Sequence, residues 1–302
     1  MLIHQYNSCE VEVISRILSY LKRPGQAGDT DKSYALEDKE PPIPAVAQPA
    51  DWLNRGVTEY NDDIFTYNPL ELPLPNQLLR AAVSGPDLDR FMYIGSAWSA
   101  VCVRYQPTKS EPTVLDIGCG VGKMARFLAI NPELRYVGFD IYLPAIRWCQ
   151  REFSRVYGDR FRFEHFDGHS SMYNPGGTVQ VQDYRFPVDD DSIDLAIGAS
   201  IFTHLYEEDM RHYFVETARV LRDGGVAVFS IHTLDEAGAF FSDSQGAGDR
   251  KILGNEQVML IDKAYFISIG EEHGLRLLDS PGRLCGQELI VFQKSSPNML
   301  VD

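Results

Sequence analysis

Positive charge is scarce in this sequence. The 302 residues include 28 Lys and Arg against 43 Asp and Glu, which gives a formal net charge of -15. Proteins that bind DNA, RNA or an anionic membrane present basic side chains to phosphate groups, and no cluster of Lys and Arg occurs anywhere in this chain. We therefore expect no nucleic-acid partner, and solubility is the simpler explanation of the acidity.

Paired cysteines and long apolar runs are also missing. The five cysteines are scattered and never form a C-x-x-C pair, which favours reduced thiols in a cytoplasmic setting and disfavours a zinc site, so no metal ligand is predicted. No window approaches 18 continuous apolar residues, so we expect no membrane span. The N-terminus has no basic start followed by an apolar block, so no signal peptide is expected either.

The N-terminal third of the chain is predicted to be an appendage and a cap. Residues 10–23 carry apolar side chains near helical spacing, which predicts an amphipathic helix that packs on the main body or contacts a partner or a second copy. A Pro- and Ala-rich linker completes the segment 1–59. We expect residues 60–110 to form a cap of short helices and residues 111–302 to form the main domain.

Strands and helices alternate after residue 112, which predicts a parallel sheet with helices on both faces. The predicted strands cover residues 113–118, 135–140, 161–166, 192–200 and 226–232. The predicted helices cover residues 121–130, 143–156 and 207–221. We expect Gly224 and Gly225 to end the last of these helices, because glycine commonly follows a helix C-terminus.

The C-terminal part departs from this alternation. A helix is predicted near residues 262–273, followed by the apolar segments 275–280 and 287–294. A Pro-Gly turn at residues 281–282 would join these two strands, and strands joined by a short turn must be antiparallel. The sheet is thus predicted to end in a hairpin.

A glycine-rich turn follows the first strand of the main domain. Residues 114–123 read "VLDIGCGVGK", so backbone there is expected to approach a ligand closely. The triphosphate-binding loop would need glycine in place of Ile117 and Ser or Thr in place of Met124. The dinucleotide fingerprint fails only at Lys123, and one mismatch in so loose a pattern does not exclude it.

Charge separates the remaining ligands. Asp116 lies at the mouth of the turn, where a carboxylate would repel a pyrophosphate and attract a cation. Asp140 ends the second strand, where a carboxylate can accept hydrogen bonds from two ribose hydroxyls. S-adenosylmethionine has an ammonium, a sulfonium and an adenosine but no phosphate, so it suits both acids.

With these features, residues 60–294 resemble the class I S-adenosylmethionine-dependent methyltransferases. "VLDIGCGVG" matches their first motif, "GFDI" their second, "FPVDDDSIDLAIGASIFTHL" the fourth-strand block, and "ARVLRDGGVAVFS" the following helix and strand. The chain is similar to bacterial members with a "YNPGG" loop and an "FTHL" loop. The resemblance implies an α/β fold, a doubly wound Rossmann-like seven-stranded sheet with a C-terminal antiparallel hairpin, and S-adenosylmethionine as the cofactor.

The resemblance also implies a set of cofactor-binding residues. In it Asp116 orients the loop or the ammonium, Asp140 holds the ribose, and Asp167 meets the adenine amino group. The full set is Asp116, Gly118, Cys119, Gly120, Gly122, Asp140, Ile141, Asp167, Gly168 and Ser200. Cys119 is common in this loop and is expected to pack there without chemistry.

The acceptor side is predicted from the loops at the carboxyl ends of the strands. An oxygen nucleophile would gain from a general base, worth roughly 10²–10⁴-fold. His204 is the first candidate, ahead of His232 and His169, and His212 comes last. We expect His169, Tyr173 and Tyr206 to contact the acceptor.

Two long connections are predicted to border the acceptor. Residues 167–192 are expected to form a substrate wall or lid, because connections of this length usually have a function. Residues 235–257 are expected to form a second flap or plain surface.

The expected acceptor is a small molecule or a carbohydrate, methylated on oxygen. The "DPPY"-type motif of amino-nitrogen DNA methylation is replaced by "GASIF", which disfavours a nucleobase nitrogen. Two alternatives remain open. One is a non-catalytic methyltransferase-like domain that acts as a partner, and the other is a nicotinamide-dependent oxidoreductase.

Overall fold

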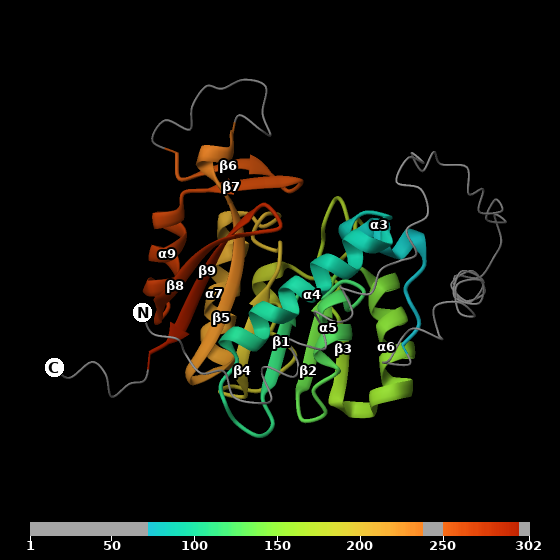
Figure 1. The fold of residues 1–302 in the computed structure, drawn as a ribbon. Helices are drawn as coiled ribbons and strands as arrows, with labels where there is room; N and C mark the ends of the chain where they lie inside the picture. Colours follow the sequence, from blue (N-terminus) through green and yellow to red (C-terminus); the bar gives the residue numbers. More distant parts are fainter. Residues whose placement is uncertain (1–71, 238–249, 296–302) are drawn as a thin grey trace, which may run out of the picture.

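The computed structural model describes residues 72–237 and 250–295. The predicted helix at 10–23, its linker and the start of the cap lie outside the described residues. Within them, the helices α3 (Gln77–Ser84) and α4 (Leu88–Tyr105) occupy the expected cap region (Figure 1). The side chain of Asn76 accepts the backbone N–H of Leu79 at 2.9 Å and so satisfies one free donor at the start of α3.

A mixed sheet forms the centre of the fold (Figure 1). Its main part has the order β3-β2-β1-β4-β5-β9-β8, with β1 to β5 parallel and β9 antiparallel to both of its neighbours. This arrangement confirms the predicted doubly wound sheet with a closing hairpin. The strands are β1 (Thr113–Ile117), β2 (Arg135–Asp140), β3 (Phe161–His165), β4 (Ile193–Gly198), β5 (Leu221–Thr233), β8 (Leu275–Leu284) and β9 (Gln287–Lys294).

Helices cover both faces of this sheet. The helices α4, α5 (Lys123–Leu128) and α6 (Leu143–Tyr157) pack on one face, and α7 (Glu207–Val220) and α9 (Lys263–Glu272) pack on the other. Side chains of β1 alternate between the two cores, so Val114 belongs to one and Leu115 to the other, both fully buried. Burying such a side chain contributes about 1.5–3 kcal/mol, which explains why the parallel strands read as continuous apolar runs.

The end of α7 differs from the prediction. The helix ends at Val220 and β5 begins at once with Leu221, so Gly224 and Gly225 lie inside the strand and do not end the helix. Leu221 is fully buried and pairs with Ile193 of β4. Sheet pairing and burial therefore redirect the chain before it reaches the glycines.

The turn of the C-terminal hairpin was also misplaced. Strand β8 continues through Pro281 and Gly282, and the two-residue turn is formed by Cys285 and Gly286 with φ of 52° and 86°. Positive φ at both positions gives the twist that suits a two-residue hairpin. Pro281 falls where the register of β8 shifts, a place in a strand that tolerates a residue without an N–H.

A second hairpin, not predicted from the sequence, joins the sheet at the carboxyl end of β5. It consists of β6 (Ile252–Asn255) and β7 (Val258–Ile261), and β7 pairs with the last two residues of β5, His232 and Thr233. Part of the expected flap is therefore ordered strand, and residues 238–249 lie outside the described residues. Including this hairpin, the described sheet has nine strands.

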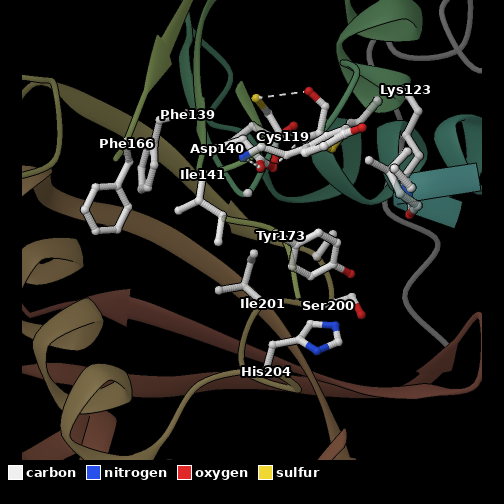
Figure 2. Close-up of a pocket in the computed structure, with 18 of the residues that line it drawn as sticks. Cys119, Lys123, Phe139, Asp140, Ile141, Phe166, Tyr173, Ser200, Ile201 and His204 are labelled. Atoms are coloured by element: carbon white, nitrogen blue, oxygen red, sulfur yellow. Dashed lines mark hydrogen bonds between the residues drawn. The ribbon is translucent and has the colours of Figure 1, made fainter. Parts of the chain in front are cut away.

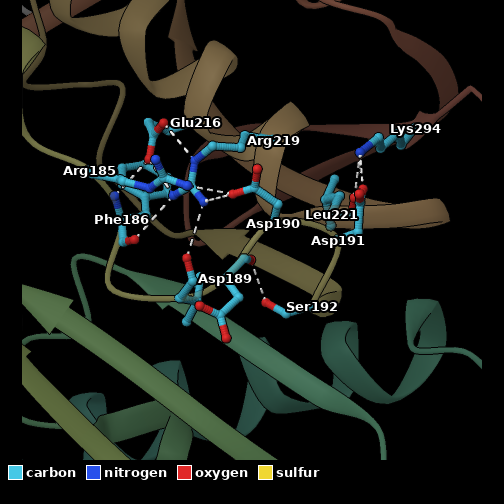
Figure 3. A network of polar contacts seen from close by, with 11 residues as sticks. Arg185, Phe186, Asp189, Asp190, Asp191, Ser192, Glu216, Arg219, Leu221 and Lys294 are labelled. Atoms are coloured by element: carbon cyan, nitrogen blue, oxygen red, sulfur yellow. Dashed lines mark hydrogen bonds and ion pairs between the residues drawn. The ribbon is translucent and has the colours of Figure 1, made fainter.

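Arg219 of α7 anchors the far end of the long connection between β3 and β4 (Figure 3). Its guanidinium pairs with Asp190 at 2.6 Å and with Glu216 at 2.6 Å, and it donates to the backbone carbonyls of Phe186 and Val188. The earlier part of the connection follows the carboxyl end of β3 and lines a cavity there with His169, Ser170 and Val179.

Candidate functional site

The glycine loop after β1 forms the floor of a pocket. Gly118, Gly120 and Gly122 all have φ between 53° and 75°, in the left-handed region that side chains disfavour. A Cβ on Gly118 would lie 1.9 Å from Cδ1 of Ile201, so only glycine allows this close approach. The loop sits beside β1, where the strand order reverses and where open α/β sheets bind ligands.

The pocket is a small cavity next to a larger one. The first has a volume of about 160 Å³ and the second about 900 Å³. Both are lined by Ile141, Phe166, His204, Leu205 and Tyr213, so they form two parts of one cleft. In Figure 2, Tyr173 lies between the Asp140 end of the smaller cavity and the His204 end.

Asp116 is a buried acid in this floor, with 3% of its surface exposed. Its carboxylate accepts the hydroxyl of Tyr136 at 2.5 Å. Burial raises the pKa of Asp116 to about 7, although the Tyr136 hydrogen bond and the charge of Lys123 lower it.

Lys123, which in the sequence is only a mismatch to the dinucleotide fingerprint, also lines the pocket. Its ammonium donates to the carbonyl of Val83 at 3.1 Å, and burial lowers the pKa of Lys123 to about 8. Its position directly after the third glycine was the signal that could have identified it as a lining residue.

Asp140 braces the loop as well as facing the pocket. One carboxylate oxygen accepts the N–H of Gly120 at 2.8 Å, and the other accepts the N–H of Tyr142 at 2.8 Å. Burial raises the pKa of Asp140, and these two hydrogen bonds act in the opposite direction. Each carboxylate oxygen has a second lone pair, so both can still accept a ribose hydroxyl.

His204 lies at the other end of the cleft. Its Nδ1 is 2.9 Å from the carbonyl oxygen of Glu256, and because a carbonyl can only accept, Nδ1 must carry the proton. In the neutral ring, Nε2 then has the lone pair, and no hydrogen bond is made to Nε2 among the described residues. The ring of Tyr173 meets His204 edge-on, with centroids 5.9 Å apart.

The remaining predicted cofactor residues divide into two groups. Cys119, Ile141 and Ser200 line the smaller cavity, whereas Gly122 precedes α5 and lines neither cavity. Asp167 and Gly168 are not lining residues either. The carboxylate of Asp167 instead accepts hydrogen bonds from the side chains of Asn174 and Thr178, so its adenine contact stays a prediction.

The predicted acceptor residues lie in different parts of the cleft. Tyr173 lines the smaller cavity, and His169 and Tyr206 line the larger one. His232 lines neither, and its Nδ1 lies 2.8 Å from the carboxylate of Glu236. Of the candidate histidines with strand-end positions, His204 alone lines both described cavities.

Several lining residues were missed by the sequence analysis. Val83 and Trp98 come from the cap helices, and Tyr213 comes from α7. Each reaches the pocket through long-range packing, and none belongs to a motif that could have identified it. The missed residues of the smaller cavity are Ala82, Val83, Trp98, Lys123, Met124, Phe139, Tyr142, Phe166, Ala199, Ile201, Leu205 and Tyr213.

Part of this chain is similar to known methyltransferase domains. Residues 115–229 match the model of a methyltransferase domain. A tRNA (carboxymethyluridine(34)-5-O)-methyltransferase from Arabidopsis thaliana is 26% identical over 141 residues, covering 46% of this chain and 28% of that protein. A cyclopropane-fatty-acyl-phospholipid synthase from Escherichia coli (strain K12) is 28% identical over 134 residues, covering 44% and 29%. The chain therefore spans less than a third of either relative.

Solved structures agree on the fold. A complex between the Haloferax volcanii Trm112 methyltransferase activator and a methyltransferase contains a chain with TM-score 0.50 and 16% identity, covering 74% of this chain and 100% of that chain. A protein from Pyrococcus horikoshii OT3 also has TM-score 0.50 and 16% identity, covering 69% and 92%. These likenesses confirm the predicted Rossmann-like fold.

The residues of the pocket fit S-adenosylmethionine, the cofactor that the domain match supports. Gly118 lines the smaller cavity with backbone alone, packed against Ile201, and Asp140 has free lone pairs for a ribose. Asp116 supplies negative charge beneath the loop, which suits a ligand with cationic centres and no phosphate.

Among the described residues there is neither a candidate membrane helix nor a candidate metal cluster. Across 72–237 and 250–295, no helix combines the length and the apolar character needed to cross a membrane. In the same residues no cluster of three or more His, Cys, Asp or Glu side chains could hold a metal ion. The described cysteines are free thiols.

Proposed function

We propose that this protein is an S-adenosylmethionine-dependent methyltransferase. The observation that carries the proposal is the pair of acids at the glycine loop, Asp116 buried beneath it and Asp140 bonded to it. This pair suits a cationic adenosine ligand and opposes a pyrophosphate. When bound, S-adenosylmethionine supplies a methyl group on a sulfonium centre that is already activated for transfer.

The chain itself contributes binding and orientation. Asp140 accepts the ribose hydroxyls, and the left-handed glycines bring loop backbone close to the methionine end. Asp167 and Gly168 meet the adenine side once Asn174 and Thr178, which now donate to the Asp167 carboxylate, move away. Because methyl transfer is an in-line displacement, holding the reacting atoms in line provides most of the rate gain.

We further propose that the acceptor atom is an oxygen, on a small molecule or a carbohydrate. The support is the tautomer of His204, whose Nδ1–H is held by a carbonyl so that Nε2 can take a hydroxyl proton. The names of the two relatives indicate a tRNA nucleotide and a phospholipid acyl chain as their acceptors. A net charge of -15 opposes both of these phosphate-bearing acceptors here.

The two alternatives make different demands on the cleft. An oxidoreductase would seat a pyrophosphate at the glycine loop, which the charge of Asp116 opposes. A non-catalytic partner domain would need a docking element such as the helix predicted at 10–23, which lies outside the described residues. One structural neighbour was solved with an activator protein, so a partner is a proposal for this chain as well.

Calorimetric titration of the full chain with S-adenosylhomocysteine and with NAD tests the proposal. We expect binding of the first and none of the second; tight NAD binding or no binding of S-adenosylhomocysteine would overturn it. Turnover is then sought by measuring S-adenosylhomocysteine release over a panel of hydroxylated small molecules and sugars. Cofactor binding without turnover on any acceptor would favour the non-catalytic alternative.

A further inference from the structure

The β6–β7 hairpin contacts both of the loops that line the acceptor end of the cleft. Its two-residue turn is formed by Glu256 and Gln257, and the strand that follows donates from the N–H of Met259 to the carbonyl of Thr203 at 2.8 Å. The turn is thereby held against the loop that carries His204. Nothing in the family resemblance assigned a role to this hairpin.

The backbone of Glu256 orients the imidazole of His204. Its carbonyl accepts the Nδ1–H of His204 at 2.9 Å, which selects the tautomer with a lone pair on Nε2. A neutral imidazole without this acceptor would be free to move its proton to Nε2. The candidate base would then present a donor where it needs an acceptor.

The side chain of Glu256 orients the second loop. One carboxylate oxygen accepts the hydroxyl of Ser170, and the other accepts the N–H of Ser171 at 3.2 Å and its hydroxyl at 2.5 Å. Ser170 is 6% exposed, and its hydroxyl oxygen accepts the N–H of Tyr173 at 3.2 Å. The carboxylate thus supports the turn that presents Tyr173 to the cavity.

We propose that Glu256 is a positioning residue that sets His204 and Tyr173 relative to each other over the cofactor pocket. Its carbonyl holds one side chain and its carboxylate holds the loop of the other, which explains the edge-on contact of the two rings. The inference rests on the proposed methyltransferase function, in which His204 takes a proton at Nε2. Errors of about 1 Å in such a geometry can cost 10²-fold in rate.

The test uses the full chain and needs no acceptor. Hydrogen exchange of the Tyr173 amide reports on the loop, and the ring ¹⁵N shifts of His204 report on its tautomer. For Glu256→Ala we expect about fivefold faster exchange at Tyr173, as follows from losing one hydrogen-bond connection. The backbone carbonyl of residue 256 remains in this variant, so His204 should keep its proton on Nδ1 in both proteins, while the affinity for S-adenosylhomocysteine stays within about threefold of the unaltered protein.

Two further variants test the contact between the Glu256 carboxylate and the loop that carries Tyr173. Glu256→Gln keeps one acceptor for the serines and should restore part of the Tyr173 protection, even if Glu256→Ala folds poorly. Ser170→Ala removes the hydroxyl that links the carboxylate to the N–H of Tyr173, so it should speed exchange at Tyr173 at least as much as Glu256→Ala and leave the His204 tautomer unchanged. Glu271→Ala removes an exposed carboxylate from α9 and should change neither signal.

Three results would overturn the inference. The first is unchanged exchange of the Tyr173 amide in Glu256→Ala, or a proton on Nε2 of His204 in the unaltered protein. The second is a loss of S-adenosylhomocysteine affinity in Glu256→Ala that parallels the loop change, because Glu256 would then hold the cofactor. The third is equal effects from Glu271→Ala. Failure of the unaltered protein to bind S-adenosylhomocysteine would refute the proposed function instead, and the loop and tautomer signals would still be measurable.

Discussion

Replacing Asp140 separates its two roles, bracing the glycine loop and holding the ribose. In Asp140→Asn the side chain keeps one oxygen, so only one of the N–H groups of Gly120 and Tyr142 keeps its acceptor. The new amide group points its own N–H toward the other donor. We therefore expect the loop to lose support and the ribose to lose its paired acceptor.

The size of the effect follows from the bonds that are lost. A hydrogen bond to a charged group contributes about 1.5–3 kcal/mol, which corresponds to about 10- to 150-fold in affinity for S-adenosylhomocysteine. A buried donor left without an acceptor costs about 1–3 kcal/mol of stability. For a domain of this size, that lowers the melting temperature by about 2–12 °C.

Calorimetry measures the affinity of Asp140→Asn, and thermal unfolding measures its stability. Asp159→Asn removes the same charge from an exposed position on the short helix after α6 and serves as the control. The reasoning is refuted if Asp140→Asn binds S-adenosylhomocysteine as tightly as the control does. A lower melting temperature with unchanged affinity would leave Asp140 with the bracing role alone.

Further changes test other parts of the site. Gly118→Ala should lose about 1–2 kcal/mol of stability from its left-handed backbone and should lose cofactor binding in calorimetry, because the new methyl pushes Ile201 into the pocket. Gly274 has φ of 80° and no atom within 4 Å of an added Cβ, so Gly274→Ala is the control. It should lose stability but keep its affinity for the cofactor. His204→Ala should slow turnover of any acceptor found by about 10²–10⁴-fold at unchanged cofactor affinity. Burial raises the pKa of Asp116 from 3.8 to about 7, so ionising this carboxyl opposes folding. The free energy of unfolding measured in urea should therefore fall as pH rises from 5 to 8, and it should fall less in Asp116→Asn.

Each of these predictions has a contrary outcome. Equal affinities in Gly118→Ala and Gly274→Ala would mean that Ile201 moves away from the ligand. Full turnover in His204→Ala would remove the candidate base. Parallel pH profiles for the unaltered protein and Asp116→Asn would mean that Asp116 ionises as it does in an unfolded chain.

Local signals carried the prediction of the fold and of the cofactor end of the site. The glycines of the loop are required by backbone angles within a few residues, so they are visible without any tertiary contact. Asp140 could be predicted at the site because the carboxyl ends of neighbouring parallel strands meet at one edge. The alternating strands and helices predicted a parallel sheet with helices on both faces, and the order of its strands came only from the structure.

Predictions failed where sheet pairing outweighed local preference. Glycine commonly ends a helix, yet Leu221 entered the sheet before Gly224 could act. A Pro-Gly pair commonly forms a turn, yet β8 carried Pro281 as part of a strand with shifted register. In both places the long-range hydrogen bonds and burial of the strand provide more free energy than the preference of one residue.

The chemistry at the acceptor end depends on side chains far apart in the chain. His204 was recognisable as a candidate, but its tautomer depends on the carbonyl of Glu256, 52 residues away. Trp98 reaches the pocket from a cap helix that precedes the glycine loop. A sequence motif reflects the backbone conformation that consecutive residues must adopt. These contacts form only when the folded sheet brings its carboxyl ends, the cap helices and the β6–β7 hairpin together.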